Sequence, residues 1–139
     1  MKVSVIVPAY KFVNYLEQAL LSTLWQKTNF EFEVLVRDDF SQDGSEEIIE
    51  RLSTFYPNLK HFRATENLGF HKNIPFLLSQ AKGEYIAYLD GDDYFFNEYK
   101  LQKQVDFLDS NPEYSMHCTG YWRNANGVYT PNNNYTWLC

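Results

Sequence analysis

The most constraining feature of this sequence is an alternation of short apolar segments with longer amphipathic ones. The apolar segments are 3–7, 32–36, 59–64 and 84–89, and the amphipathic segments are 15–25, 45–55, 73–81 and 98–108. Short apolar runs that alternate with segments of helical periodicity predict strand-to-helix units with right-handed crossovers. We therefore expect an α/β fold with a doubly wound, mostly parallel sheet and flanking helices.

Prolines and glycines mark the ends of these segments. Pro8 closes the first apolar run, Pro57 stops the second helix, and Gly83 fits the end of the third. Beyond Pro112 the pattern changes, and the segments 114–119 and 127–130 predict additional strands.

Length, charge and cysteine content narrow the class of protein. A chain of 139 residues with 45% hydrophobic residues is expected to form one domain with its own core. The net charge of −6 argues against a nucleic-acid partner, which usually requires an excess of basic residues. Because the chain has no long apolar stretch and no basic, apolar leader, we expect a cytoplasmic location. Cys118 and Cys139 are expected to be free thiols.

The strongest local signal for chemistry is Asp90-Gly91-Asp92-Asp93, which directly follows an apolar strand. Carboxylates that lie this close repel one another unless a cation is present. Mg²⁺ and Mn²⁺ prefer such oxygens and commonly bind through one or two carboxylates together with substrate phosphates. The alternative is a solvated acidic loop in which Asp93 caps a following turn.

A second acidic pair, Asp38-Asp39, ends the second predicted strand. If the two strands are neighbours, the two acidic clusters face one crevice. Asp39 is then a candidate for hydrogen bonding to a nucleoside, while one member of the pair is expected to bind backbone N–H groups of its own turn. Asp43 is expected to be the N-cap of the next helix rather than a ligand, because Gly44 and Ser45 resemble a helix start.

Two further segments are candidates for nucleotide binding. The turn Pro8-Ala9-Tyr10 after the first strand can place backbone atoms and an aromatic ring against a base. It lacks the glycines of a dinucleotide-binding turn, and the chain contains no P-loop. Lys72, which lies close to Asn67 and Gly69, can offset phosphate charge, although a plain surface lysine is the alternative.

Taken in order, these motifs resemble those of family 2 glycosyltransferases. The segments that carry the resemblance are VSVIVPAY, Ser22 to Gln26, FEVLVRDDFSQDGS, ENLGFHKN, AKGEYIAYLDGDD and KLQKQVDFL. They extend from residue 3 to about residue 112. The resemblance implies a GT-A fold for a single domain over residues 1–139, with 1–112 as the core match and 113–139 as the start of an acceptor-side region.

The resemblance also implies an activity and a donor site. The activity is the inverting, hexosyltransferase-like transfer of a sugar from a nucleotide diphosphate, with a UDP-sugar as the expected donor and Mn or Mg as the metal. The acceptor would be a glycan or a lipid-linked glycan in cell-surface glycan synthesis, and the full-length protein could lie peripherally at the inner face of the membrane. The implied donor-site residues are Pro8, Ala9, Tyr10, Asp38, Asp39, Asn67, Gly69, Lys72, Asp90, Gly91 and Asp92.

Within that set, the resemblance gives several residues separate roles. Pro8, Ala9 and Tyr10 would line the nucleoside pocket, and Asp39 would contact the base. Asp90 would bind the ribose or the diphosphate and contribute to the metal site, and Asp92 would be the main metal ligand.

The chain departs from the family pattern in one respect. Inverting transfer needs a base that deprotonates the acceptor hydroxyl, and no residue matches the family's base, so the catalytic residue is unknown. The alternative function is therefore a catalytically incomplete fragment that binds the nucleotide sugar. A nucleotidyltransferase would need a basic, glycine-rich loop in place of Pro8 to Lys11. A receiver-type signalling module would need an acidic pair after the first strand.

Overall fold

The computed structural model describes residues 1–131. The chain divides into two units, Met1–Val105 and Asp106–Cys139, which are described separately. Its elements are β1 (Val3–Ala9), α1 (Leu16–Leu24), β2 (Phe32–Asp38), α2 (Ser45–Phe55), β3 (Leu59–His61), α3 (Phe70–Gln80), β4 (Tyr85–Tyr88), α4 (Lys100–Ser110), β5 (Trp122–Ala125) and β6 (Val128–Pro131). The single domain over residues 1–139 that the sequence analysis expects stays a prediction.

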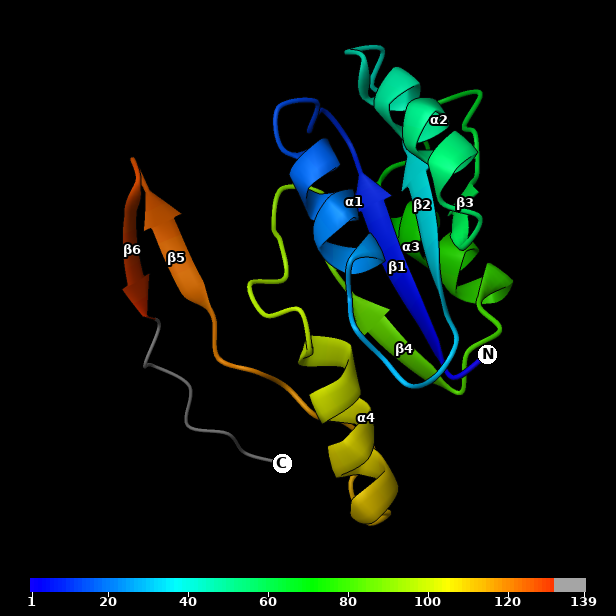
Figure 1. The fold of residues 1–139 in the computed structure, drawn as a ribbon. Helices are drawn as coiled ribbons and strands as arrows, with labels where there is room; N and C mark the ends of the chain where they lie inside the picture. Colours follow the sequence, from blue (N-terminus) through cyan, green and yellow to red (C-terminus); the bar gives the residue numbers. More distant parts are fainter. Residues whose placement is uncertain (132–139) are drawn as a thin grey trace. The chain divides into compact units, whose positions relative to one another are not determined.

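The first unit contains a parallel sheet with the strand order β3-β2-β1-β4 (Figure 1). In the register of the sheet, Val5 of β1 lies opposite Val34 of β2 on one side and Ala87 of β4 on the other. β1, β2 and β3 are each followed by a helix that leads to the next parallel strand of this sheet, so the predicted α/β architecture is confirmed.

The two faces of the sheet carry separate apolar cores. Helices α1 and α2 cover one face, and α3 packs on β1 and β2 on the other (Figure 1). Because successive side chains of a strand point to opposite faces, Val5 and Val7 belong to the α1 core, whereas Ile6 packs with Leu35 and Leu77 of α3. Burial of each such side chain contributes about 1.5–3 kcal/mol.

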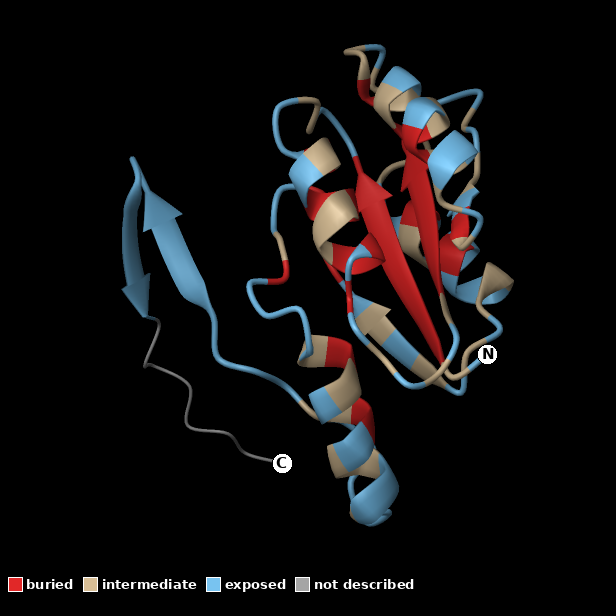
Figure 2. Ribbon diagram, in the orientation of Figure 1, coloured by how far each residue is buried: buried red, intermediate tan, exposed pale blue. Residues whose placement is uncertain are grey.

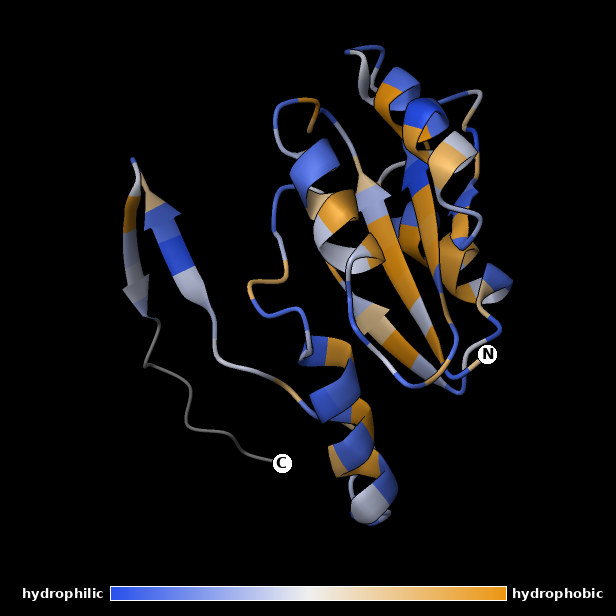
Figure 3. Cartoon of the chain, viewed as in Figure 1, coloured by the Kyte–Doolittle hydropathy of each residue, from blue (hydrophilic) through white to orange (hydrophobic). Residues whose placement is uncertain are grey.

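Strands β1 and β2 are therefore enclosed on both faces. β1 is buried along its whole length and β2 along all but its first residue (Figure 2). Both are rich in hydrophobic side chains (Figure 3). β4 lies at one end of the strand order, and its residues Ile86 and Tyr88 are exposed. No helix in residues 1–131 has the length and the apolar character needed to cross a bilayer.

The amino end of β4 is held against β1 by close backbone packing. Ser4 Oγ donates to Glu33 Oε1 at 2.7 Å and accepts the N–H groups of Lys82 at 3.1 Å and Gly83 at 2.8 Å. A Cβ atom on Gly83 would lie 2.3 Å from Ser4 N. Only glycine permits this approach, so Gly83 and Ser4 set where β4 begins.

Several predicted boundaries differ from the structure. The third helix begins at Phe70 rather than at residue 73, because Gly69, with φ of 77°, starts the helical turn earlier. The third strand ends at His61 rather than at residue 64, and the last helix spans Lys100–Ser110 rather than 98–108.

In the second unit, the predicted strand 114–119 is wrong, and the predicted strand 127–130 corresponds to β6. β6 pairs antiparallel with β5 across Asn126-Gly127, whose φ angles of 53° and 81° suit a tight hairpin turn. Cys118 is a free, exposed thiol, whereas Cys139 lies outside the described residues.

Candidate functional site

The strand order creates a switch point at the carboxyl end of β1. From β1 the chain proceeds to β2 and β3 on one side, and β4 then pairs with the other side of β1. In doubly wound sheets, ligands bind in the crevice outside the carboxyl ends of the strands at such a point. The predicted turn Pro8-Ala9-Tyr10 ends β1, and Asp90 follows two residues after β4, so both segments lie at this position.

The strands that carry the two acidic clusters are not neighbours, so the condition under which both clusters would face one crevice is not met. Both β2 and β4 pair with β1, which therefore separates Asp38 and Asp39 from the Asp90 loop. The reason is the reversal of strand order at the switch point, which the sequence pattern does not reveal. Both clusters still lie at the carboxyl edge of the same sheet.

Gly91 brings the acidic loop into contact with the end of β1. It is buried, and a Cβ atom there would lie 2.9 Å from Phe12 Cδ2, 3.2 Å from Ala9 Cβ and 3.3 Å from the Pro8 carbonyl oxygen. The N–H of Asp93 donates to the carbonyl of Asp90 at 3.0 Å and closes a turn around the glycine. Gly91 thus seats the loop against the segment predicted to line a nucleoside pocket.

The carboxylates of this loop have few partners in the chain. The Tyr88 hydroxyl donates to the Asp90 carboxylate, while the side chains of Asp92 and Asp93 form no hydrogen bond or ion pair within residues 1–131. Burial, the hydrogen bond to Asp90 and the neighbouring acidic charges raise the pKa of Tyr88. Burial and the charges of Asp92 and Asp90 raise the pKa of Asp93. The loop therefore concentrates negative charge.

The carboxylates of this loop suit a hard divalent cation only if a bound substrate supplies further oxygen ligands. Within the described residues, no group of three or more His, Cys, Asp or Glu side chains is arranged to hold a metal. Asp90 and Asp92 can offer two carboxylates, and Mg²⁺ or Mn²⁺ sites of this kind are usually completed by substrate phosphates and water. The residues present therefore fit a metal that binds together with a phosphorylated substrate.

Asp38, the last residue of β2, and Asp39, which follows it, are instead bound by the chain itself. The Asp38 carboxylate accepts the Ser41 N–H at 2.8 Å and the Ser41 hydroxyl, as expected for one member of the pair. Burial raises the pKa of Asp38, and the hydrogen bonds from Ser41 oppose that shift. The Asp39 carboxylate, with 2% of the residue exposed, accepts the N–H groups of Leu68 at 3.1 Å and Gly69 at 2.7 Å.

The predicted residues Asn67, Gly69 and Lys72 lie on the segment that Asp39 holds. Asn67 Oδ1 accepts the Gly69 N–H at 3.1 Å, so the asparagine stabilises its own turn. Lys72 is exposed in the first turn of α3, and its N–H donates to the Gly69 carbonyl at 3.0 Å.

Two polar residues that the sequence analysis did not select complete this region. The Arg37 side chain, with the residue 5% exposed, places Nη1 3.1 Å from Asn73 Oδ1 and 3.6 Å from Asp39 Oδ1. Asn73 Nδ2 donates back to the Arg37 carbonyl at 3.3 Å. The sequence signal that could have revealed Arg37 is its position at the end of an apolar strand. A charged group buried there requires a polar partner.

Asp43 has a role different from the one predicted. The N-cap of α2 is Gly44, with φ of 101°, and Asp43 lies one residue earlier. Its carboxylate accepts the N–H groups of Ser45 at 3.0 Å and Val13 at 3.3 Å. Burial acts to raise the pKa of Asp43, but the hydrogen bonds from Ser45 and Val13 lower it below its ordinary value.

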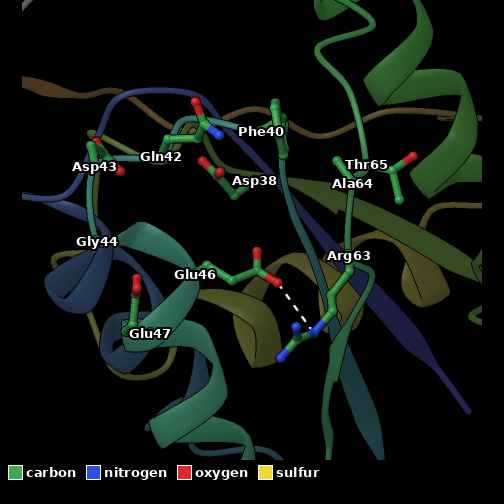
Figure 4. Close-up of a pocket in the computed structure, with 10 residues that line it drawn as sticks. All are labelled: Asp38, Phe40, Gln42, Asp43, Gly44, Glu46, Glu47, Arg63, Ala64 and Thr65. Atoms are coloured by element: carbon green, nitrogen blue, oxygen red, sulfur yellow. Dashed lines mark ion pairs between the residues drawn. The ribbon is translucent and has the colours of Figure 1, made fainter.

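A pocket of about 660 Å³ lies beside the start of α2 (Figure 4). Glu46 and Arg63 face each other in it with Oε1 and Nε 3.3 Å apart. Of the predicted site residues only Asp38 lines it, and the other acidic lining residues are Asp43, Glu46 and Glu47. Four carboxylates against one paired arginine disfavour a diphosphate, so this pocket does not replace the switch point as the candidate site.

Comparison with known proteins places the chain among glycosyltransferases. It is 39% identical over 111 residues to an uncharacterised protein of Mycobacterium tuberculosis H37Rv, covering 79% of this chain and 32% of that protein. It is 33% identical over 134 residues to an uncharacterised glycosyltransferase of Rickettsia conorii, covering 92% and 20%. With one from Haemophilus influenzae the identity is 37% over 109 residues, covering 78% and 43%. The chain thus spans less than half the length of these relatives.

Solved structures show the same fold. Staphylococcus aureus TarS 1-349 in complex with UDP-GlcNAc matches with a TM-score of 0.75 and 31% identity, covering 99% of this chain and 39% of that one. The mannosyltransferase PcManGT of Pyrobaculum calidifontis, in complex with GDP-Man and Mn²⁺, matches with a TM-score of 0.69 and 28% identity, covering 77% and 32%. The glycosyl transferase family 2 model matches residues 4–138, which confirms the resemblance seen in the motifs. The chain belongs to glycosyltransferase family 2.

Proposed function

We propose that this chain is the nucleotide-sugar-binding part of an inverting, metal-dependent glycosyltransferase of cell-surface glycan synthesis. Its donor is a UDP-sugar, its metal is Mn²⁺ or Mg²⁺, and the acceptor of the whole protein is a glycan or a lipid-linked glycan. The whole protein works in the cytoplasm, at the inner face of the membrane. The alternative for the chain by itself is a fragment that binds the donor without transferring the sugar.

The single observation that carries this proposal is the contact between the acidic loop and the end of β1. Gly91 packs on Ala9 and on the Pro8 carbonyl, so a segment suited to a nucleoside lies against a segment suited to a metal–diphosphate at the switch point. A nucleotide diphosphate needs both within the length of one molecule. A receiver-type signalling module offers no account of this pairing.

The solved neighbours support the choice of ligand class. TarS was solved with UDP-GlcNAc and with UDP, and PcManGT with GDP-Man and Mn²⁺. These ligands belong to those proteins, and they support a nucleotide-sugar donor and a divalent metal for this one. TarS favours UDP over GDP as the first nucleotide to test.

In the proposed site, Tyr10 and the backbone of Pro8 and Ala9 line the nucleoside pocket. Asp90 and Asp92 hold the metal, and Lys72 offsets diphosphate charge. A divalent metal bound there supplies Lewis-acid stabilisation of the charge on the departing diphosphate. The base that deprotonates the acceptor has no candidate in this chain, and we assign it to the remainder of the whole protein.

Donor binding is tested by calorimetric titration of the chain with UDP, dTDP and GDP, with and without Mn²⁺. We expect Mn²⁺-dependent binding of UDP that weakens at least about tenfold in Asp92→Ala, the loss of a charge-assisted contact. Glu31→Ala is the matched control, because Glu31 is exposed beside the amino end of β2, at the opposite edge of the sheet. A folded chain that binds no nucleotide under any of these conditions would contradict the proposal.

Transfer is measured separately, with a UDP-sugar and a panel of glycan acceptors. The fragment alternative predicts donor binding with little or no sugar transferred. Robust transfer by the 139-residue chain would reject that alternative and would require a base within the chain.

A further inference from the structure

The acidic loop after β4 is tied to the strand that precedes it by a tyrosine. The Tyr88 hydroxyl donates to Asp90 Oδ1. Within residues 1–131, Asp90 Oδ2 has no hydrogen bond or ion pair. The backbone of Asp90 is engaged as well, because its carbonyl accepts the Asp93 N–H at 3.0 Å. Asp90 is therefore fixed at its backbone and at one carboxylate oxygen, and the second oxygen remains for a ligand.

The periodicity of the strand places Tyr88 where it can make this contact. Successive side chains of a strand point to opposite faces. Ala87 packs against the core on the α1 side of the sheet, and Leu89 belongs to that core. The backbone ladder continues past Tyr88, because the Leu89 N–H donates to the Ile6 carbonyl at 3.1 Å. Tyr88 therefore shares the opposite face with Asp90, two residues further along the chain.

The apolar core does not require a tyrosine at this position. On this face of the sheet α3 packs on β1 and β2, and Tyr88 of β4 is 41% exposed. A phenyl ring would occupy the same place on the strand beside Ile6, its partner in the register of the sheet. What the tyrosine adds is a hydroxyl that donates to Asp90. The residue type thus points to a role in the acidic loop.

The hydrogen bond limits how Asp90 can bind a cation. Ca²⁺ accepts about six to eight oxygens in flexible geometry and readily takes both oxygens of one carboxylate. Mg²⁺ demands near-octahedral coordination, keeps several waters, and is usually held by one or two carboxylates together with substrate phosphates. A carboxylate with one oxygen already engaged suits the second kind of site better than the first.

We propose that Tyr88 is a positioning residue, which holds the Asp90 carboxylate with one oxygen free so that the donor site takes Mg²⁺ or Mn²⁺ in preference to Ca²⁺. This inference rests on the proposed function, in which Asp90 and Asp92 hold the metal. Tyr88 acts through Asp90 and does not itself touch the metal or the nucleotide. Loss of a hydrogen bond to a metal-binding side chain typically lowers metal affinity about 10- to 100-fold.

The sign of the effect separates positioning from electrostatics. Removal of the Tyr88 hydroxyl leaves the Asp90 carboxylate without the donor that partly offsets its charge. By Coulomb's law this change alone strengthens the binding of every divalent cation. A loss of Mg²⁺-dependent binding in Tyr88→Phe must therefore come from the freed orientation of the carboxylate.

The test measures the affinity for UDP by calorimetry in the presence of Mg²⁺, in the presence of Ca²⁺ and without metal. The variants are Tyr88→Phe and the matched control Tyr56→Phe. The Tyr56 hydroxyl accepts the Trp25 indole N–H at 2.9 Å, and Tyr56 follows α2 at the amino edge of the sheet. Each variant loses one hydroxyl and one hydrogen bond, but the Tyr56 hydroxyl is remote from the acidic loop. Folding of each variant is checked by circular dichroism and thermal unfolding.

We expect Tyr88→Phe to weaken Mg²⁺-dependent UDP binding about tenfold and to change UDP binding with Ca²⁺ or without metal by less than about twofold. Tyr56→Phe should change none of the three affinities. Equal losses with Mg²⁺ and Ca²⁺ would overturn the proposed selectivity, and a loss of the same size without metal would assign Tyr88 to the nucleotide instead. Unchanged or tighter Mg²⁺-dependent binding by folded Tyr88→Phe would also overturn the proposal.

A double-mutant cycle without nucleotide or metal tests the contact by itself. Urea denaturation of the wild-type chain, Tyr88→Phe, Asp90→Ala and the double variant gives the coupling between the two side chains. We expect a coupling of about fivefold in the unfolding equilibrium constant, from a partly exposed hydrogen bond to a charged group.

The cycle also separates failure of this proposal from failure of the proposed function. If the wild-type chain binds UDP under none of the conditions, the proposed function fails, and the part of this proposal that concerns the metal fails with it. A coupling of about fivefold would then still support the hold of Tyr88 on Asp90. The absence of coupling would overturn that step as well.

Discussion

The loop after β2 and the loop after β4 both present aspartates at the carboxyl edge of one sheet, and they use them in opposite ways. Asp38 and Asp39 accept hydrogen bonds from the chain's own N–H and hydroxyl groups. In the loop after β4, the Asp90 carboxylate accepts the Tyr88 hydroxyl, and the Asp92 side chain has no hydrogen bond or ion pair within residues 1–131.

The difference shows that an acidic motif has to be judged by the donors around it. Carboxylates that are satisfied by the chain stabilise the chain, as a buried polar network does. Carboxylates that lack such donors repel one another and lower stability until a cation or another ligand arrives. The first loop therefore contributes structure, and the second is available for chemistry.

The largest expected effect comes from breaking the network behind the first loop. Arg37→Met retains most of the side-chain volume but leaves the Asp39 charge buried without its partner. We expect a loss of about 3–5 kcal/mol in the free energy of unfolding, measured by urea denaturation. A loss below about 1 kcal/mol would mean that the two loops do not differ in the way described.

A smaller effect is expected where the second loop touches β1. In Gly91→Ala, the new Cβ would lie 2.9 Å from Phe12 and 3.2 Å from Ala9 Cβ, so the loop or the ring must move. We expect about 1–3 kcal/mol of destabilisation together with weaker binding of UDP and Mn²⁺. Gly120→Ala is the control, because within residues 1–131 no atom beyond its chain neighbours lies within 4 Å of its added Cβ. Unchanged UDP affinity in Gly91→Ala would show that nucleotide binding does not depend on the contact between the acidic loop and the Pro8–Tyr10 segment.

A third test uses pH to compare two carboxylates within the first loop. The pKa of Asp38 is raised, so its ionisation lowers stability as pH rises from about 4 through its folded-state pKa. The pKa of Asp43 is lowered, so its contribution is present above about pH 4 and is lost as pH falls through the folded-state pKa. Relative to wild type, Asp38→Asn should gain stability with rising pH and Asp43→Asn should lose it. Urea denaturation between about pH 3 and pH 8 measures both, and slopes of the same sign would refute this assignment.

The smallest effect is expected in the second loop itself. Without metal, Asp92→Asn removes one charge that repels Asp90 and Asp93 and breaks no hydrogen bond of the chain. We expect a change within about 0.5 kcal/mol in the free energy of unfolding, toward greater stability. Destabilisation by more than about 1 kcal/mol would show that Asp92 serves the fold and would erase the contrast between the loops.

Much of the fold could be predicted from local patterns. Strands β1 and β2 are buried on both faces and appear as short apolar runs, and α2 begins at Ser45 and ends at Phe55, as its periodicity predicted. The strand predicted over 114–119 was wrong because an apolar and aromatic run does not specify a pairing partner. The Asn126-Gly127 turn was the better signal, since its backbone geometry by itself favours a hairpin.

The candidate site was only partly accessible from the sequence. The acidic loop after β4 could be found because all of its carboxylates lie within four residues. The Arg37–Asn73 contact joins residues 36 positions apart, and no periodicity reports it. Whether Asp39 faces a ligand or the 67–69 turn depends on where that turn folds back, which is a property of tertiary structure.

The two glycines that flank β4 have a consequence for how this segment can vary among related sequences. Gly83 lies against the backbone of Ser4 at one end of β1, and Gly91 lies against Pro8 and Ala9 at the other. The number of residues between Gly83 and Gly91 must therefore match the distance between these two contact points on β1. An inserted or deleted residue would turn the side chains of β4 to the opposite face and would detach one of the two contacts. Substitutions along β4 can be accommodated, but its residue count cannot change.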